Sequence, residues 1–282
     1  MIFGQWVFSS NGPGQQPMGT SRPLHVLLVH VWYWPHVGGG DQHVEQIGRE
    51  LVRRGHRVTV WCADVPAHEE SRFRRGGVDV IRITPSRLLG GVDPLVSVSD
   101  LDLSDVDVVH LHDTLPVLIR RTLSKAKKAG KPVVTTYHND YVKKTALGRA
   151  VNRIRWVLQG RRTIHSSDAG IVLTPFFEQL LRTKGVQGHL DILPNGFSPV
   201  EEAPRRPSSL PKTEESTPMI SFVGRLSFQK GLDVLMDAMD SYGSNPGFHL
   251  AIAGKGQLSG WLEDRHANSS AKENISVLGL VT

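Results

Sequence analysis

Residues 219–231 read MISFVGRLSFQKG. The apolar run Met219–Val223 predicts a buried parallel strand, and Gly224 permits a tight turn after it. Apolar residues then recur at helical spacing, so we expect a helix to begin near Lys230 or Gly231. These residues are Leu232, Leu235, Met236 and Met239.

A strand, a glycine turn and a helix start in this order present free backbone N–H groups to an anion. Arg225 and Lys230 add two cations at the same place. Arginine offers a planar fork to phosphate oxygens and lysine a mobile point charge. The stretch therefore predicts a diphosphate site, although the same residues taken alone fit a solvated loop equally well.

Bulk properties restrict the class of protein. The chain has 282 residues, a net charge of +6 and ordinary globular composition, which predicts two domains and an anionic ligand, nucleic acid or acidic membrane as partner. Neither a Cys/His finger spacing nor an aromatic RNA-binding strand accompanies the charge. The single cysteine, Cys62, excludes an internal disulfide and a multi-cysteine zinc site and suits a cytoplasmic location.

The first 23 residues predict a disordered tail. They carry several glycines and prolines, and they lack the basic start and apolar core of a secretory signal. No stretch of the sequence reaches the roughly 18 continuous apolar residues of a membrane span.

Apolar runs alternate with helical patterns along the rest of the chain. The expected strands are residues 24–31, 58–61, 78–83, 106–112, 133–137, 169–173 and 190–193, followed by 219–223, 248–253 and 275–278. The expected helices follow the Gly38–Gly40 run, pass through 125–128, and span roughly 141–165 and 230–241. This alternation predicts an α/β fold with mostly parallel, doubly wound sheets.

A proline-rich, charged stretch at 199–218 separates two such patterns. The expected organisation is a tail at 1–23, a Rossmann-like domain at 24–198, a linker at 199–218 and a partial second Rossmann-like domain at 219–282. In open α/β sheets ligands collect at the carboxyl ends of strands, so two such domains in tandem predict a cleft between them.

Six motifs in order carry a family resemblance. They are PHVGGGDQHVEQIGRELVRRGHRVTV, VDVVHLHD, VVTTYHND, ILPNGF, FVGRLSFQKGLDVLMDA and LAIAGKG. Over residues 24–282 the chain resembles a GT-B glycosyltransferase of the large retaining family 4. The resemblance implies transfer of a sugar from a nucleotide-diphosphate donor, with UDP- or GDP-sugar favoured, to a lipid-linked, glycan or small-molecule hydroxyl. The first domain would bind the acceptor and the second the donor.

The resemblance also implies roles for residues of the first domain. Gly38 and Gly39 match a loop that approaches the donor phosphates, and Gly39 also approaches the acceptor; the plainer interpretation is a strand-to-helix turn. His138 matches the active-site histidine that contacts the transferred sugar and the acceptor side; the alternative is a structural hydrogen bond. Asn195 and Gly196 are interpreted as a turn rather than a contact.

In the second domain, Arg225 and Lys230 match the pair that binds the donor diphosphate and stabilises the leaving group. Gly224, Gly254 and Gly256 match donor-binding loops.

His110 and His112 lie on one face of their strand, which suggests metal ligation, but the sequence shows no third ligand. The family works without a metal, so the resemblance implies none here, and packing or a minor cleft contact is favoured for His112.

A basic amphipathic helix is expected at 141–165. It has seven basic residues, and its apolar stripe is Leu147, Val151, Ile154 and Leu158. Family resemblance implies docking on an anionic membrane from the cytoplasmic side; a core-packed helix with a solvated basic face is the equal alternative.

The second domain departs from the family pattern. It has only residues 219–282, and the family's later pair of glutamates has no counterpart. A catalytically inactive truncated fragment, or one half of a split glycosyltransferase, is therefore the alternative expectation. A dinucleotide-dependent oxidoreductase is disfavoured, because no Gly-x-Gly-x-x-Gly opens the first sheet.

Overall fold

The computed structural model describes residues 22–36, 38–89, 93–114, 116–138, 146–196, 210, 217–244 and 247–281. The chain divides into two compact units, Met1–Gly196 and Phe197–Thr282. The expected tail lies outside the described residues except for Arg22 and Pro23, and so does most of the expected linker. Arg22 forms an ion pair of 2.6 Å with Asp107.

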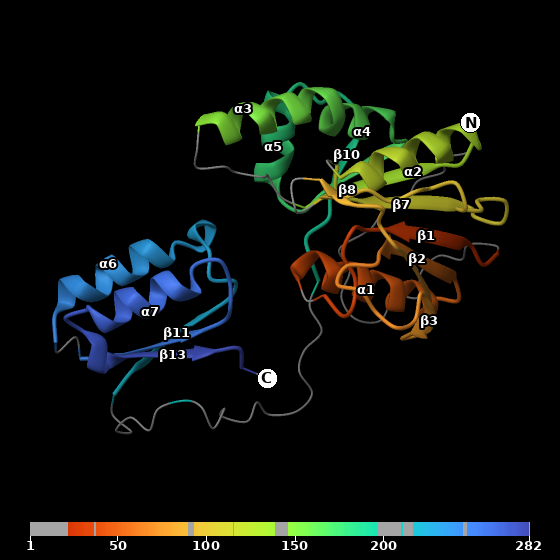
Figure 1. Ribbon diagram of the computed structural model, residues 1–282. Helices are drawn as coiled ribbons and strands as arrows, with labels where there is room; N and C mark the ends of the chain where they lie inside the picture. Colours follow the sequence, from red (N-terminus) through yellow and green to blue (C-terminus); the bar gives the residue numbers. More distant parts are fainter. Residues whose placement is uncertain are drawn as a thin grey trace, which may run out of the picture. The chain divides into compact units, whose positions relative to one another are not determined.

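The first unit is built on an eight-stranded sheet of order β10-β9-β8-β7-β1-β2-β4-β3 (Figure 1). Its strands are β1 (His25–Val29), β2 (Arg57–Ala63), β3 (Arg72–Arg75), β4 (Val78–Ile83), β7 (Val108–His112), β8 (Val133–Tyr137), β9 (Ala169–Val172) and β10 (Leu190–Ile192). All pair in parallel except β3, which runs antiparallel to β4. β5 (Leu88–Leu89) and β6 (Asp93–Pro94) form a separate short ribbon.

The helices of this unit are α1 (Gly39–Arg53), α2 (Val117–Lys128), α3 (Ala146–Arg155), α4 (Arg161–Ser166) and α5 (Pro175–Thr183). A π-helical turn, Trp156–Gly160, joins α3 to α4. The expected helix at 141–165 is therefore α3, this turn and α4, and residues 139–145 lie outside the described residues.

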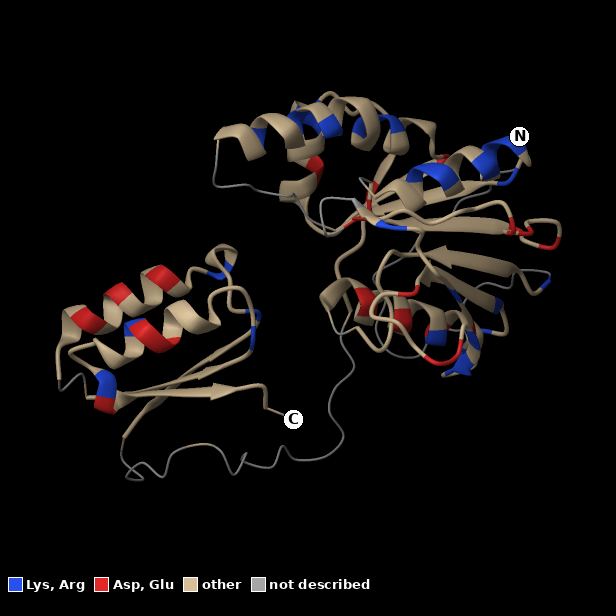
Figure 2. Ribbon diagram, viewed as in Figure 1, with Lys and Arg blue, Asp and Glu red and all other residues tan. Residues whose placement is uncertain are grey.

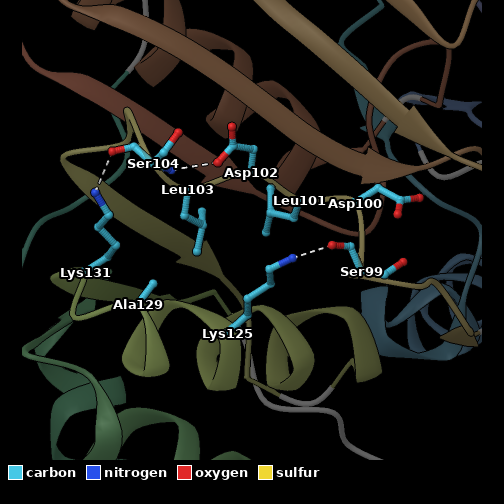
Figure 3. A pocket seen from close by; sticks show the side chains of 9 residues that line it. All are labelled: Ser99, Asp100, Leu101, Asp102, Leu103, Ser104, Lys125, Ala129 and Lys131. Carbon is cyan, nitrogen blue, oxygen red and sulfur yellow. Dashed lines mark hydrogen bonds between the residues drawn. The ribbon is translucent and has the colours of Figure 1, made fainter.

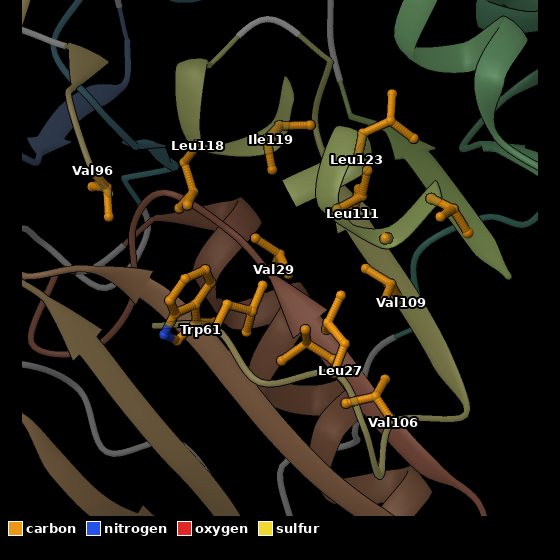
Figure 4. Packing of buried hydrophobic residues seen from close by; sticks show 14 of the residues in the cluster. Leu27, Val29, Trp61, Val96, Val106, Val109, Leu111, Leu118, Ile119 and Leu123 are labelled. Carbon is orange, nitrogen blue, oxygen red and sulfur yellow. The ribbon is translucent and has the colours of Figure 1, made fainter. Parts of the chain in front are cut away.

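Alternate residues of the central strands point into two cores. Leu27 and Val29 of β1 pack with Leu118 of α2 (Figure 4). Val26 and Leu28 pack on the opposite face with residues of α1. Both faces of the sheet are therefore covered, which explains why the parallel strands read as continuous apolar runs.

Besides the short ribbon of β5 and β6, the sequence analysis did not predict β3 and α5 of the first unit. β3 reads RFRR, with three charged residues of four, so it lacks the apolar pattern of a strand; as an edge strand it tolerates that charge. α5 begins at Pro175 after Thr174, whose side-chain oxygen accepts from the backbone N–H of Phe177. This N-cap and proline pair is a recognisable helix-start signal.

The second unit has a three-stranded parallel sheet of order β11-β12-β13, formed by β11 (Met219–Val223), β12 (His249–Ala253) and β13 (Ile275–Gly279). Figure 1 shows α6 (Leu232–Tyr242) and α7 (Ser259–Ala267) side by side over the sheet. Their apolar residues pack with Leu250 and Ile252 of β12.

One expectation about residues 219–231 was wrong and one was confirmed. β11 is a parallel strand but not a buried one, because it pairs with only one described strand; Ile220 and Val223 are 46% and 76% exposed. The helix starts at Leu232, directly after Gly231, as expected; a 3₁₀ turn at Phe228–Lys230 and left-handed Gly231 (φ 68°) precede it.

Candidate functional site

The strand order of the first unit defines a topological switch point. β1 is flanked by β2 and β7, and the chain leaves β1 for α1 on one face and β7 for α2 on the other. In such sheets the crevice at the carboxyl ends of the two central strands holds the ligand. The side chains at the ends of β1 and β7 are therefore the first candidates for a functional site.

Histidines lie at three adjacent strand ends there. His30 follows β1, His112 ends β7, and His138 follows β8. The parallel register places His112 opposite Thr136, two residues before His138, so the rings of His112 and His138 point to the same face. Their ring centres are 5.4 Å apart.

A further histidine joins them from α1. The ring centre of His43 lies 4.8 Å from that of His138 and 5.6 Å from that of His112. The side chain of Asn195 counteracts part of the lowering of the His43 pKa, and its interpretation as a turn residue stays a prediction. The ring of His110 lies tilted beside that of His112, with ring centres 4.1 Å apart, and its Nε2 lies 2.8 Å from Thr136 Oγ1.

Hydrogen bonds fix these rings. His112 Nδ1 and His138 Nε2 are 3.2 Å apart. The Nδ1–H of His30 donates to the carbonyl oxygen of His112 at 3.1 Å, and Nε2 of His30 lies 3.3 Å from a carboxylate oxygen of buried Asp41. Asp41 also contacts His36. The cluster is held by the sheet and by the first turn of α1 together.

Burial keeps the rings of His110, His112 and His138 uncharged at pH 7. It lowers the pKa of His138 and of His110 to about 3, helped by neighbouring histidines. Burial also lowers the pKa of His112 well below its usual range. The pKa of His43 is lowered by burial and by His30. Because a neutral imidazole has one N–H and one lone pair, these groups can donate and accept hydrogen bonds at pH 7.

The start of α1 borders the histidines. Gly38 is its N-cap in extended conformation, without a side-chain cap, so amide N–H groups of the first turn remain available. A Cβ atom on Gly39 would meet no protein atom within 4 Å, whereas one on Gly40 would lie 2.9 Å from Nε2 of His30. Space for a ligand thus exists at Gly39.

In the second unit, Arg225 and Lys230 are both exposed and lie between β11 and α6. A Cβ on Gly224 would meet no protein atom within 4 Å. Gly254 and Gly256 instead pack on protein: a Cβ on Gly256 would lie 2.2 Å from the carbonyl oxygen of Leu226. These two glycines hold the loop that carries Arg225 against the end of β12.

His43 was missed by the sequence analysis, which found no third ligand for the pair at 110 and 112. Its position, four residues into α1, carries no motif of its own, and only the packing of α1 on the sheet brings it to His112 and His138.

A cavity of about 520 Å³ lies elsewhere, at the residues that precede β7 and β8 (Figure 3). Lys125 Nζ and Lys131 Nζ donate there to the carbonyl oxygens of Ser99 and Ser104. Because strands of a parallel sheet share their direction, this is the amino-terminal edge, opposite to the histidines. Its lysines are already bound to backbone, and we assign it no site.

Comparison with known proteins adds family evidence. Residues 37–201 match the sequence model of Glycosyltransferase Family 4, and residues 207–282 match that of Glycosyl transferases group 1. The chain is 25% identical over 276 residues to a phosphatidylinositol N-acetylglucosaminyltransferase subunit of Arabidopsis thaliana, covering 94% of this chain and 59% of that protein. It is 24% identical over 282 residues to an uncharacterized glycosyltransferase of Methanocaldococcus jannaschii, covering 90% and 69%.

Solved structures share the fold. Sucrose-phosphate synthase of Thermosynechococcus elongatus aligns with a TM-score of 0.62 at 15% identity, over 92% of this chain and 71% of that one. Anabaena HepE in complex with UDP and glucose aligns with a TM-score of 0.62 at 14% identity, over 91% and 69%. The chain thus spans about three fifths of the Arabidopsis relative and about seven tenths of these structures.

Proposed function

The chain belongs to Glycosyltransferase Family 4 and has the α/β, Rossmann-like architecture of GT-B glycosyltransferases; from this premise we propose that it transfers a sugar from a nucleotide-diphosphate sugar to a hydroxyl acceptor. The observation that carries the proposal is the placement of His138 and His112 beside the glycine-rich start of α1, at the switch point of the sheet. HepE, a structural neighbour, is described in complex with UDP and glucose, which supports a nucleotide-sugar donor.

Arg225 and Lys230 are proposed to bind the donor diphosphate. Both are exposed cations in the loop after β11, and the amide N–H groups at the start of α6 lie next in the chain. Charge-assisted hydrogen bonds from such groups strengthen as the leaving diphosphate gains charge. Gly254 and Gly256 contribute by positioning this loop.

His138 is proposed to hydrogen-bond a hydroxyl of the transferred sugar. Burial lowers its pKa to about 3, so the ring is neutral at pH 7 and positions the sugar rather than protonating the leaving group. We propose transfer with retention: the bond between the anomeric carbon and the phosphate oxygen breaks, the acceptor oxygen bonds to the same face of that carbon, and the acceptor proton passes to the leaving phosphate. Gly38 and Gly39 approach the donor phosphates, and Gly39 the acceptor.

A donor screen tests the function. Thermal shift with UDP-, GDP- and ADP-sugars should show stabilisation by one nucleotide class, since a ligand at 100 times its Kd adds about 2.7 kcal/mol. Arg225→Ala and Lys230→Ala should weaken that binding about tenfold or more, because a hydrogen bond to a charged group contributes about 1.5–3 kcal/mol.

Lys272→Ala is the matched control, an exposed cation of the same unit outside the proposed site. Unchanged donor affinity in both Arg225→Ala and Lys230→Ala would contradict the assignment. Donor binding without turnover of any acceptor would favour a chain that binds sugar nucleotides but does not catalyse transfer by itself.

We also propose that α3 docks on the anionic, cytoplasmic surface of a membrane. No residue of α3 is buried. The apolar stripe is open to solvent: Leu147, Val151, Ile154 and Leu158 are 76%, 46%, 58% and 66% exposed. Figure 2 shows basic residues along α3 and α4. The side chains of Arg149, Arg153, Arg161 and Arg162 are all exposed.

An exposed apolar stripe beside basic residues is typical of helices that lie in a membrane interface. This observation favours docking over the alternative of a core-packed helix. Among the described residues, no helix is long and apolar enough to span a bilayer. The Arabidopsis relative, whose name includes phosphatidylinositol, supports a lipid-linked acceptor.

A further inference from the structure

We propose that His43, His112 and His138 form a binding site for one divalent transition-metal ion of the zinc class. Each ring offers one nitrogen, and the three nitrogens lie within 4.8 Å of one another. They come from α1, β7 and the end of β8, so the fold and not a local motif brings them together.

The spacing of the rings fits a tetrahedral ion. With Zn–N bonds of about 2.0–2.1 Å, two ligating nitrogens are about 3.3 Å apart and two ring centres about 5 Å apart. His112 Nδ1 and His138 Nε2 are 3.2 Å apart. The three ring centres are separated by 4.8, 5.4 and 5.6 Å. Only small side-chain movements are needed to close the set on one ion.

The donor set selects the class of ion. Three imidazoles without a carboxylate suit zinc, cobalt, nickel or copper and not the hard ions magnesium or calcium. Three protein ligands leave one coordination position open, as in zinc sites that bind an exogenous ligand.

Metal and sugar would compete for the same ring. This consequence rests on the proposed function, which assigns His138 to the transferred sugar. A metal ion on His138 uses the lone pair that the sugar hydroxyl needs, so zinc should inhibit transfer competitively with the donor. Metal binding itself does not depend on that assignment.

Cobalt(II) spectroscopy tests the site directly. The full chain, free of any affinity tag, is titrated with Co²⁺, whose visible bands are far more intense in tetrahedral than in octahedral coordination. We expect an intense spectrum that saturates at one equivalent and is abolished by Zn²⁺. His43→Ala and His138→Ala should weaken Co²⁺ binding by more than about tenfold. Changes outside the ligand set already reduce metal affinity by about 10–100-fold, and each of these variants removes a ligand.

The matched control is His189→Ala, an exposed histidine that contacts Asp191; it should bind Co²⁺ as the unchanged chain does. His112→Ala removes a core side chain, so circular dichroism must show that this variant folds. If it does not fold, His43→Ala and His138→Ala, at partly buried positions, test the site. A weak octahedral spectrum, or equal binding by His43→Ala and the unchanged chain, overturns the proposal. Donor binding is measured separately in the thermal-shift screen. Failure of the metal site therefore leaves the proposed function intact, and failure of the proposed function leaves the metal site intact.

Discussion

The backbone of Gly254 passes so close to Gly224 that a Cβ atom on Gly254 would lie 1.8 Å from the carbonyl oxygen of Gly224. Gly254 also has a φ of 142°. Backbone hydrogen bonds reinforce the approach: the N–H of Gly224 donates to Ala253, and that of Leu226 to Lys255. The loop after β11 therefore packs against the loop after β12. The position of Arg225 thus depends on Gly254, which lies far from it in the sequence.

Replacing Gly254 by alanine should destabilise the second unit by about 3 kcal/mol or more, because backbone must move and the φ is unfavourable. Urea unfolding measures the loss. Gly260→Ala in α7 is the matched control: a Cβ there meets no atom within 4 Å, and alanine should stabilise the helix by up to about 1 kcal/mol. Equal stabilities of the two variants would contradict the packing.

Gly40→Ala should disturb the histidine cluster by displacing the ring of His30. Its Cβ would lie 2.9 Å from Nε2 of His30, so the ring must turn away from Asp41 and from the carbonyl of His112. We expect kcat/KM for transfer to fall about tenfold, as expected for misplaced catalytic groups. Gly188→Ala, in a turn with open space around it, should retain activity. Equal activity of the Gly40→Ala and Gly188→Ala variants would contradict an effect of Gly40 on the histidine cluster.

The thiol of Cys62 should be inert in the folded protein. The residue is fully buried, and burial raises its pKa from 9.0 to about 12. At pH 8 a disulfide reagent should therefore label no thiol in the native chain and one in urea. Since the folded pKa is the higher one, the stability contributed by this thiol is complete below pH 9 and is lost as the pH rises toward 12. Rapid native labelling at pH 8 would contradict this burial.

Asp64→Ala should destabilise the first unit by about 3–5 kcal/mol, because it leaves the buried guanidinium of Arg82 without its carboxylate. The two groups are 2.8 Å apart, and the Arg82 side chain is 0% exposed. Asp237→Ala breaks the exposed contact with Arg265 and should cost less than about 1 kcal/mol. Chemical denaturation compares them, and a small loss in Asp64→Ala would speak against a buried ion pair.

Vesicle flotation tests the proposed surface on α3. The chain should float with anionic vesicles at low salt and less at high salt, because basic residues supply part of the attraction. Leu147→Gln combined with Ile154→Gln should reduce binding several-fold by removing exposed apolar contacts. Val234→Gln on α6, 68% exposed, is the control. Failure to bind any vesicle, or equal binding by all variants, would retire the membrane proposal.

Much of the fold was predictable, because both faces of the large sheet are buried and its strands are uninterrupted apolar runs. β4 and β8 begin and end at the residues expected from the sequence. The prediction failed where burial is partial: β3 carries charge at an edge, and β11 reads as buried although Val223 is exposed. Apolar composition predicts that a segment is a strand, but not whether a neighbour covers it.

The sequence by itself determined the class of fold and marked His138, Gly38, Gly39, Arg225 and Lys230 through motifs of contiguous residues. Only the tertiary structure decided that His43, His112 and His138 share one site, since residues so far apart in the chain carry no joint local signal. They meet because β7 and β8 pair in parallel with a fixed register, which aligns their carboxyl ends, and because α1 packs across that edge. Parallel pairing converts three distant positions into one cluster, and that step depends on strand order rather than on any stretch of sequence.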